Sequence, residues 1–204
     1  QTELYPTMKL AVAGKEITCG GETLAEGIAV KKPGVVTKPV VSNLVDDILL
    51  VDEQSLEWAV GSLIEQQRVV SEGAGAAAIA AIRQNPYLFA GKKVGVVICG
   101  GNIDPRLLAS ILNRNMASDG RLARLRIDIS DEPGMLAAIT ASISRCGGNI
   151  VEIYHQRLFY DVPAKLAKID AVIETRGPQH VDEIIADLRG SNFLVRQLED
   201  GSAS

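Results

Sequence analysis

The pattern of hydrophobic and polar positions changes its character near residue 118. The stretch "LRIDIS" alternates strictly, because Leu125, Ile127 and Ile129 are separated by polar residues, and this predicts a strand with one buried face. The segments that follow are a helix over 131–148, strands over 149–161 and 165–175, a helix over 178–190 and a strand over 193–198. The order βαββαβ predicts a ferredoxin-like sandwich of about 80 residues.

Both predicted helices of this region carry one apolar stripe and residues suited to helix ends. In the first helix the stripe consists of Leu136, Ile139 and Ile143. Gly147 and Gly148 then end that helix. In the second helix, Pro178 and Gly190 mark the two ends. Its stripe consists of Val181, Ile184, Ile185 and Leu188.

Residues 1–118 instead alternate between helical and buried-strand patterns, which indicates an α/β region. Asp52 is placed to cap a helix, after a short strand at 48–51. The apolar face of that helix carries Leu56, Ala59, Val60, Leu63 and Ile64. The run "VGVVI" at 94–98 has no alternation and predicts a parallel strand buried on both faces. A helix with Pro105 in its first turn follows.

The polar stretch "NRNMASDGR" at 113–121 separates these two patterns. Its residues are typical of turns, so we place the domain boundary there. The expected domains are 1–118 and 119–204.

Composition narrows the classes of function. The 204 residues are 47% hydrophobic and carry a net charge of −4, which gives no electrostatic case for a nucleic-acid or membrane partner. Three cysteines without paired spacing favour a reducing, cytoplasmic compartment, and two histidines make a zinc site improbable, so no metal site is expected. The first Met is Met8, so we expect a segment of a longer protein.

The stretch "CGGNID" is the first candidate for ligand chemistry. It matches neither GxGxxG nor GxxxxGK[ST], so nucleotide binding is a weak interpretation. One interpretation is a tight turn with a buried thiol. The other is a ligand site, because the ends of parallel strands bind ligands in α/β sheets, and Cys99 and Asn102 offer polar side chains there. Glu72 is a second candidate, either as an acid at a helix start or as a ligand-facing carboxylate.

Five stretches in order carry a resemblance to a known family: "ELYP", "GGETLAEGIAV", "LVDDILLVDEQSL", "VVSEGAGAAAIAAI" and "VVICGGNID". Together they resemble the C-terminal part of the catalytic domain of threonine and serine dehydratases. These enzymes depend on pyridoxal phosphate and have the tryptophan synthase β-like fold. The following "DEPGML" and "GGNI" resemble an ACT domain, an amino-acid-sensing module.

The resemblance implies roles for six residues at a cofactor site. Cys99 would meet the pyridine nitrogen of pyridoxal phosphate, and a neutral thiol there suits loss of a β-hydroxyl. Glu72 would lie close to the ring. The backbone around the cofactor would be shaped by Gly27, Gly100, Gly101 and Asn102.

The family's Schiff-base lysine lies in a Ser-Phe-Lys-x-Arg-Gly context that none of the nine lysines here has. We therefore expect this lysine and the phosphate-binding loop upstream of the chain, and the chain alone to be inactive. A neighbouring cation site of the family would need an acid where Gln1 stands, so it is not carried over.

The ACT resemblance implies an amino-acid effector site at Asp131, Gly134 and Asn149, usually between paired modules. Isoleucine or valine is the expected effector. The alternative is that Asp131 only caps the helix and Asn149 only follows the Gly-Gly stop in a left-handed turn. Tyr154, His155 and Phe159 are expected to serve packing or an interface, and the exposed edges of the sheet favour a homo-oligomer.

For the complete protein, the resemblance implies conversion of L-threonine to 2-oxobutanoate and ammonia. The alternative from another class is a non-catalytic amino-acid-binding or assembly module. A dehydrogenase bearing an ACT domain is a weaker third possibility, since a GxGxxG turn is missing.

Overall fold

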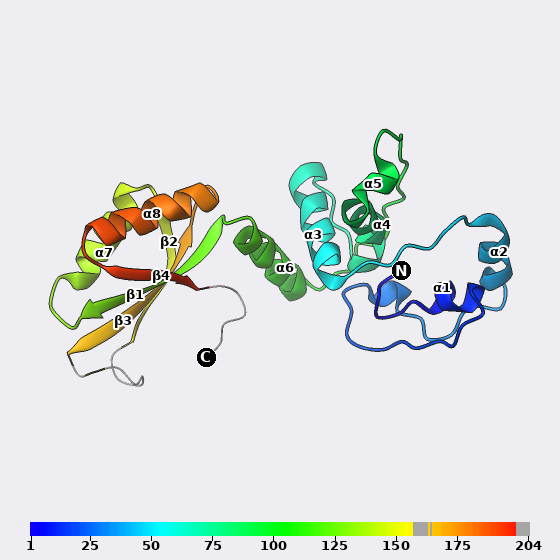
Figure 1. Cartoon of the computed structure of the whole chain (residues 1–204), viewed down its shortest axis with the longest axis horizontal. Helices are drawn as coiled ribbons and strands as arrows, with labels where there is room; N and C mark the ends of the chain where they lie inside the picture. Colours follow the sequence, from blue (N-terminus) through cyan, green and yellow to red (C-terminus); the bar gives the residue numbers. More distant parts are fainter. Residues whose placement is uncertain (157–162, 164, 199–204) are drawn as a thin grey trace. The chain divides into compact units, whose positions relative to one another are not determined.

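The computed structural model describes residues 1–156, 163 and 165–198. The chain divides into two compact units, Gln1–Leu112 and Asn113–Ser204, whose elements are labelled in Figure 1. The fold is a mixture of helices and one sheet, as the sequence predicts. The two domains expected on either side of residue 118 stay a prediction.

The N-terminal unit is largely helical. Its elements are α1 Thr7–Val12, the 3-10 turn η1 Glu26–Ile28, α2 Thr37–Leu44, α3 Glu53–Ser62, the π-helical turn η2 Leu63–Gln67, α4 Gly73–Gln84 and α5 Pro86–Phe89. The core lies between α3 and α4, where Leu56, Val60 and Ala76 are fully buried. The predicted cap of α3 is confirmed, because Asp52 Oδ1 accepts a hydrogen bond of 2.6 Å from the Ser55 amide.

The predicted strand at 94–98 is absent from the structure. These residues have no strand assignment, and the side chain of Val97 is 82% exposed. A parallel strand needs hydrogen-bonded neighbours, and the described part of this unit offers only an isolated parallel bridge between Thr2 and Val51. For the same reason the expected strand at 48–51 is reduced to that single bridge.

The expected turn at 113–121 is wrong up to residue 118, because helix α6 Pro105–Ser118 continues through it. The helix ends at Ser118, and Gly120, two residues later, has a left-handed φ of 66°. The amides of Gly120 and Arg121 then donate to the carbonyls of Ala117 and Met116 at 3.0 and 2.8 Å. The polar residues Asn113, Arg114 and Ser118 are exposed on this helix, and the sequence pattern took them for a turn.

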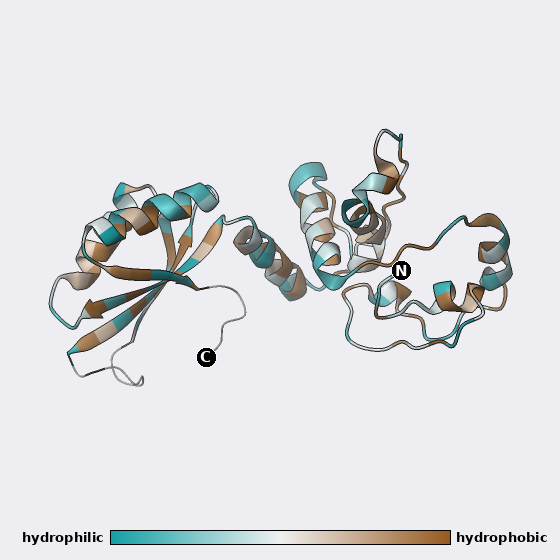
Figure 2. Ribbon diagram, in the orientation of Figure 1, coloured by the Kyte–Doolittle hydropathy of each residue, from teal (hydrophilic) through white to brown (hydrophobic). Residues whose placement is uncertain are grey.

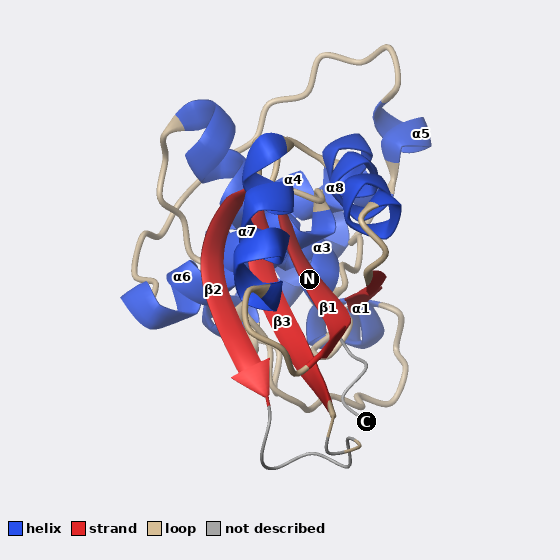
Figure 3. Ribbon diagram, turned by 90° about the vertical axis from the view of Figure 1, so that its left-hand side faces the viewer, coloured by secondary structure: helices blue, strands red, loops and turns tan. Residues whose placement is uncertain are grey.

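The C-terminal unit confirms the predicted βαββαβ order. Its elements are β1 Leu122–Ser130, α7 Met135–Arg145, β2 Asn149–Gln156, β3 Leu166–Glu174, α8 Pro178–Gly190 and β4 Leu194–Leu198. The four strands form an antiparallel sheet in the order β2-β3-β1-β4. Figure 3 shows α7 and α8 together over one face of this sheet. The predicted strand end at 157–161, with Phe159, lies outside the described residues.

The core of this unit fills the space between the helices and the sheet. β1 and β3 contribute alternate residues, and much of the sheet is brown on the hydropathy scale of Figure 2. The stripe of α8 is confirmed, and Ile139 and Ile143 of α7 are fully buried. Leu136 is 36% exposed, so the prediction that it belongs to the buried stripe of α7 was wrong. The neighbouring Met135 packs against the core instead. No helix among the described residues is long and apolar enough to span a membrane.

The face of the sheet opposite α7 and α8 holds a buried carboxylate. Asp170 of β3 alternates with core residues and is fully buried. Arg126 Nε and Nη2 donate to its two oxygens at 2.7 and 2.8 Å, and Arg124 Nη2 donates at 2.9 Å. The hydrogen bond from Arg126, helped by Arg124, holds the pKa of Asp170 below its ordinary 3.8 although burial opposes this.

This arrangement predicts an acid-sensitive contribution to stability. Because the folded pKa is lowered, the contribution is complete above about pH 3.8 and disappears as the pH falls through the folded pKa. Asp170→Asn should lower the free energy of unfolding by about 1–3 kcal/mol at neutral pH, because the half-exposed Arg124 and the mostly buried Arg126 lose a charged acceptor. Hydrogen exchange in β1 and β3 reports this unit separately.

The matched control is Asp182→Asn, a substitution of an exposed aspartate on α8. It should change the free energy of unfolding little, both at neutral pH and at pH 2.5. A difference between the parent and Asp170→Asn that persists undiminished at pH 2.5 would contradict the proposed role of the ionised carboxylate.

Candidate functional site

The predicted ligand residues gather at the start of α4. Residues 99 and 100 form a turn that lies against this helix end, because the Glu72 amide donates to the Gly100 carbonyl at 3.0 Å. Ser71 Oγ, from a fully buried side chain, donates to the Cys99 carbonyl at 3.4 Å. Hydrogen bonds to the backbone carbonyls of Cys99 and Gly100 therefore hold together two segments that are 28 residues apart in the sequence.

Glycines allow this close approach. A Cβ atom added at Gly75 would overlap the Cys99 carbonyl, and one added at Gly73 would overlap the Leu24 carbonyl. Gly100 has a left-handed φ of 72°, and a Cβ there would overlap the Glu72 carboxyl group. The small residues of "SEGAG" are therefore required by contacts with two distant backbone segments.

Gly27 completes the group from η1. A Cβ at Gly27 would lie 3.1 Å from Ala74 Cβ and 3.6 Å from Glu72 Oε1. The Glu72 carboxyl group thus lies next to both Gly27 and Gly100. Gly101 is close to the preceding segment, since a Cβ there would lie 3.5 Å from the Val70 carbonyl oxygen.

The structure brings together Glu72, Gly27 and the turn of Cys99, Gly100 and Gly101. Asn102 follows this turn and is exposed. Cys99 is also exposed, so the interpretation as a buried thiol is wrong, and it does not end a strand. Glu72 occupies the N-cap position of α4, but its side chain forms no capping hydrogen bond. Its carboxyl group is therefore available to a ligand at this helix end, where the dipole favours negative charge.

A cavity of about 580 Å³ adjoins Gly27. Its lining includes Ala74, Ala77 and Ala81 of α4, and Thr7 and Met8 of α1. Small alanines on one face of α4 leave this space open. The Thr7 hydroxyl is buried without a hydrogen-bond partner among the described residues.

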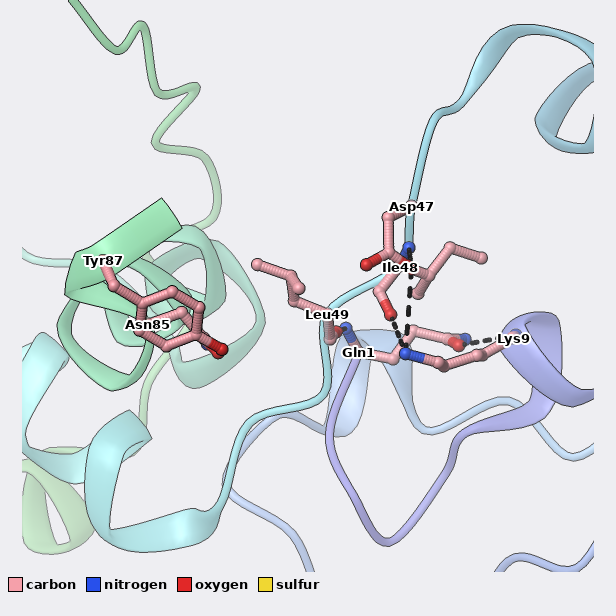
Figure 4. Close-up of polar contacts among 7 residues, drawn as sticks. All are labelled: Gln1, Lys9, Asp47, Ile48, Leu49, Asn85 and Tyr87. Atoms are coloured by element: carbon pink, nitrogen blue, oxygen red, sulfur yellow. Dashed lines mark hydrogen bonds and ion pairs between the residues drawn. The ribbon is translucent and has the colours of Figure 1, made fainter. Parts of the chain in front are cut away.

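In the N-terminal unit, Lys9 forms a hydrogen bond and an ion pair, and the other lysines are exposed. Figure 4 shows Lys9 Nζ donating to the Ile48 carbonyl at 2.7 Å and lying 3.8 Å from Asp47 Oδ1. The Lys9 amide also donates to Gln1 Oε1 at 3.0 Å. Lys9 therefore ties α1 to the first residue of the chain and, through Ile48, to the segment before α3. Tyr87 and Asn85 form a separate contact of 3.5 Å. The lysines expected to face solvent, Lys31, Lys32, Lys92 and Lys93, are all exposed.

The predicted effector residues lie at opposite ends of the C-terminal sheet. Asp131 follows β1, and its amide donates to the Lys165 carbonyl at 2.9 Å. Asn149 begins β2 opposite Glu174, which in turn lies opposite the first residue of β1. Nine residues of strand separate these ends by about 25–30 Å. A single chain therefore does not bring Asn149 together with Asp131 and Gly134.

Neither simple structural role holds for these residues. The N-cap of α7 is Gly134 with a φ of 93°, so Asp131 does not occupy the N-cap position. Asn149 lies in β2 without a positive φ, and its side-chain Nδ2 donates to Glu174 Oε2 at 3.0 Å. Nearby on β2, the Tyr154 hydroxyl donates to Glu152 Oε2 at 2.7 Å, which raises the pKa of Tyr154. Cys146 packs partly buried against the core, and this burial raises the pKa of its thiol.

Three residues that matter for the site were not singled out from the sequence: Ser71, Gly75 and Glu53. Ser71 and Gly75 hold the Cys99 turn, and Glu53 binds the loop that leads to Gly27. The alternation of glycine in "EGAG" was the available signal for Gly75. Glu53 carried no signal, because an acid in a first helical turn is ordinary.

Comparison with known proteins gives this geometry a context. Residues 1–100 match the family model "Pyridoxal-phosphate dependent enzyme". The L-threonine ammonia-lyase of Thermotoga maritima is 38% identical over 198 residues, which cover 96% of this chain and 49% of that protein. The chain spans about half the length of the curated relatives it matches.

Two solved structures are similar to parts of the chain. The threonine deaminase of T.th. is 27% identical with a TM-score of 0.46, and the match covers 50% of this chain and 38% of that one. The ACT domain from the GTP pyrophosphokinase of Chlorobium tepidum is 24% identical with a TM-score of 0.32, and the match covers 38% of this chain and 96% of that domain.

The residues around Glu72 fit pyridoxal phosphate on chemical grounds. The exposed thiol of Cys99 can meet a pyridine nitrogen, and the glycines at 27 and 100 present backbone without side chains in the way. Residues 1–100 therefore match the family of pyridoxal-phosphate dependent enzymes, and over almost its whole length the chain is similar to about half of a threonine ammonia-lyase.

Proposed function

We propose that the complete protein is a threonine/serine ammonia-lyase that converts L-threonine to 2-oxobutanoate and ammonia. The observation that carries this proposal is the convergence of Glu72, Gly27 and the Cys99–Gly100 turn at the start of α4. The similarity to a threonine ammonia-lyase over 96% of this chain supports it. A cytoplasmic location is part of the proposal, and the three free cysteines suit a reducing compartment.

In this proposal the chain supplies one side of the cofactor site. Bound pyridoxal phosphate withdraws electrons from the Cα atom of the amino acid attached to it. Cys99 offers a neutral thiol to the pyridine nitrogen and cannot keep it protonated as a carboxylate would. With this neutral partner, bound pyridoxal phosphate would withdraw electrons only moderately, which would suit loss of the β-hydroxyl. Gly27, Gly100, Gly101 and Asn102 shape the backbone that holds the ring.

The polarity at Cys99 can be tested in the complete enzyme. Cys99→Ser should keep most of the activity, because a hydroxyl is also a neutral partner for the nitrogen. Cys99→Asp should lower kcat for elimination by about tenfold or more, because the ring nitrogen then gains a proton partner. The rate of 2-oxobutanoate release measures both, and an Asp variant as active as the parent would refute the contact.

The C-terminal unit is proposed to be an amino-acid-sensing ACT domain that works as a pair. Since Asn149 lies at the opposite end of the sheet from Asp131 and Gly134, two modules must combine to form the site. Antiparallel pairing of two β2 strands would place the Asn149 end of one module beside the Gly134 end of its partner. The other edge strand, β4, has five residues, and Arg189 Nη2 already donates to its Val195 carbonyl at 3.2 Å.

Mixing two variants tests this shared site. Asn149→Ala removes one half of it, and Gly134→Asn obstructs the other half. In the single chain a Cβ at Gly134 meets nothing within 4 Å, and asparagine is among the side chains that a left-handed backbone strains least, so the variant should still fold with some loss of stability. Each variant alone should lose calorimetric binding of isoleucine or valine.

Mixed pairs of the two variants should recover one intact site in every pair. Recovery would not occur if each module bound its effector alone. Undiminished binding by Asn149→Ala would remove this residue from the site, and a monomer at all concentrations would contradict the pairing.

The chain of residues 1–204 alone is predicted to lack ammonia-lyase activity. Lys9 is held by Asp47 and Ile48, and the other lysines of this unit, at 15, 31, 32, 38, 92 and 93, are exposed, so we expect none of them to attach the cofactor covalently. The cofactor's remaining polar contacts contribute only about 0.5–1.5 kcal/mol each. The chain should release no 2-oxobutanoate with threonine and pyridoxal phosphate present. Turnover, or borohydride-dependent labelling of one specific lysine, would place the catalytic lysine within this sequence.

A further inference from the structure

Glu53, the first residue of α3, binds a loop that belongs to another part of the chain. Its Oε1 accepts hydrogen bonds from the hydroxyls of Thr23 at 2.6 Å and Thr2 at 3.0 Å. Its Oε2 accepts a hydrogen bond of 2.7 Å from the Leu24 amide. Three donors from two distant segments therefore meet one half-buried carboxylate.

This carboxylate does not serve its own helix. The first turn of α3 is capped by Asp52, whose Oδ1 accepts from the Ser55 amide. Asp52 Oδ2 also accepts a hydrogen bond of 2.9 Å from Gln84 Nε2, which ties the start of α3 to the end of α4. The three donors that meet the Glu53 carboxylate all come from outside α3, so its side chain acts on the loop.

The loop held by Glu53 leads directly to the cofactor side of the site. The Thr23 hydroxyl accepts a hydrogen bond of 3.1 Å from the amide of Ala25, which is fully buried. The Leu24 carbonyl presses against Gly73, where no side chain would fit. Two residues after Ala25, Gly27 contacts Ala74 and approaches the Glu72 carboxyl group. The loop is thus fixed between Glu53 on one side and the start of α4 on the other.

We propose that Glu53 is a positioning residue for the cofactor. It sets the place of Gly27 relative to Glu72 by anchoring Thr23 and Leu24, and it does not itself touch the cofactor. This inference rests on the proposed function, because Gly27 and Glu72 are assigned to the cofactor there. Its consequence is that a change at Glu53 should alter cofactor affinity through the order of residues 23–27.

The experiment uses the full-length enzyme with Glu53→Ala and the matched control Glu22→Ala. Glu22 is an exposed carboxylate of the same loop, so the control removes the same charge without the contacts to Thr23 and Leu24. Hydrogen exchange of the amides at 23–27 and the Kd for pyridoxal phosphate, from its fluorescence, are measured for both. Glu53→Ala should speed exchange and raise Kd about tenfold, since buried donors lose their acceptor, and Glu22→Ala should change neither.

A second pair of variants guards against misfolding of Glu53→Ala. Thr23→Val removes the hydroxyl with almost no change of shape, and Thr23→Ser keeps it. The expected order of cofactor affinity is parent and Thr23→Ser first, then Thr23→Val. Glu53→Gln should be intermediate, because it keeps one acceptor oxygen.

The outcomes separate this inference from the proposed function. Faster exchange at 23–27 with an unchanged Kd for pyridoxal phosphate would overturn the positioning role while leaving the cofactor site intact. An equal Kd for Thr23→Val and Thr23→Ser would do the same. A parent enzyme that fails to bind pyridoxal phosphate would instead refute the proposed function, and the inference with it.

Discussion

The carbonyl oxygen of Cys99 lies against Gly75 so closely that no side chain fits between them. The rest of the candidate site depends on this contact. It holds the glycine turn at the start of α4, where the Glu72 amide bonds Gly100 and the Glu72 carboxyl group faces Gly27. A methyl group at position 75 would overlap the Cys99 carbonyl and push the turn away from the start of α4. The small residues of α4 are thus a condition for assembling the site.

The two units bury their apolar residues to different extents. The C-terminal unit closes a core between one sheet and two helices, and every core residue of β1 and β3 is almost fully buried. The N-terminal unit buries α3 against α4 but leaves Val35, Val36 and Val97 among its strongly exposed residues. Exposed apolar surface of this kind is typical of places where a protein contacts another polypeptide.

Polar groups specify geometry in both units. Glu53 gathers three donors around the loop before Gly27, and Asp170 gathers two guanidinium groups on the sheet. In each case one carboxylate links segments far apart in the chain, and its removal would take the acceptor from donors that are at least partly shielded from water. Such groups add little net stability compared with apolar packing, but they restrict the arrangement of the elements around them.

The sequence alone was sufficient for the βαββαβ order, the cap at Asp52 and the apolar faces of α3 and α8, because these follow from local periodicity and local capping chemistry. The same local rules failed at 94–98, where a strand needs partners from elsewhere, and at 113–118, where polar residues on an exposed helix face resembled a turn. The resemblance named Cys99, Glu72 and Gly27, but only the tertiary structure showed that they converge. Their contacts join segments tens of residues apart, and no local pattern encodes such distances.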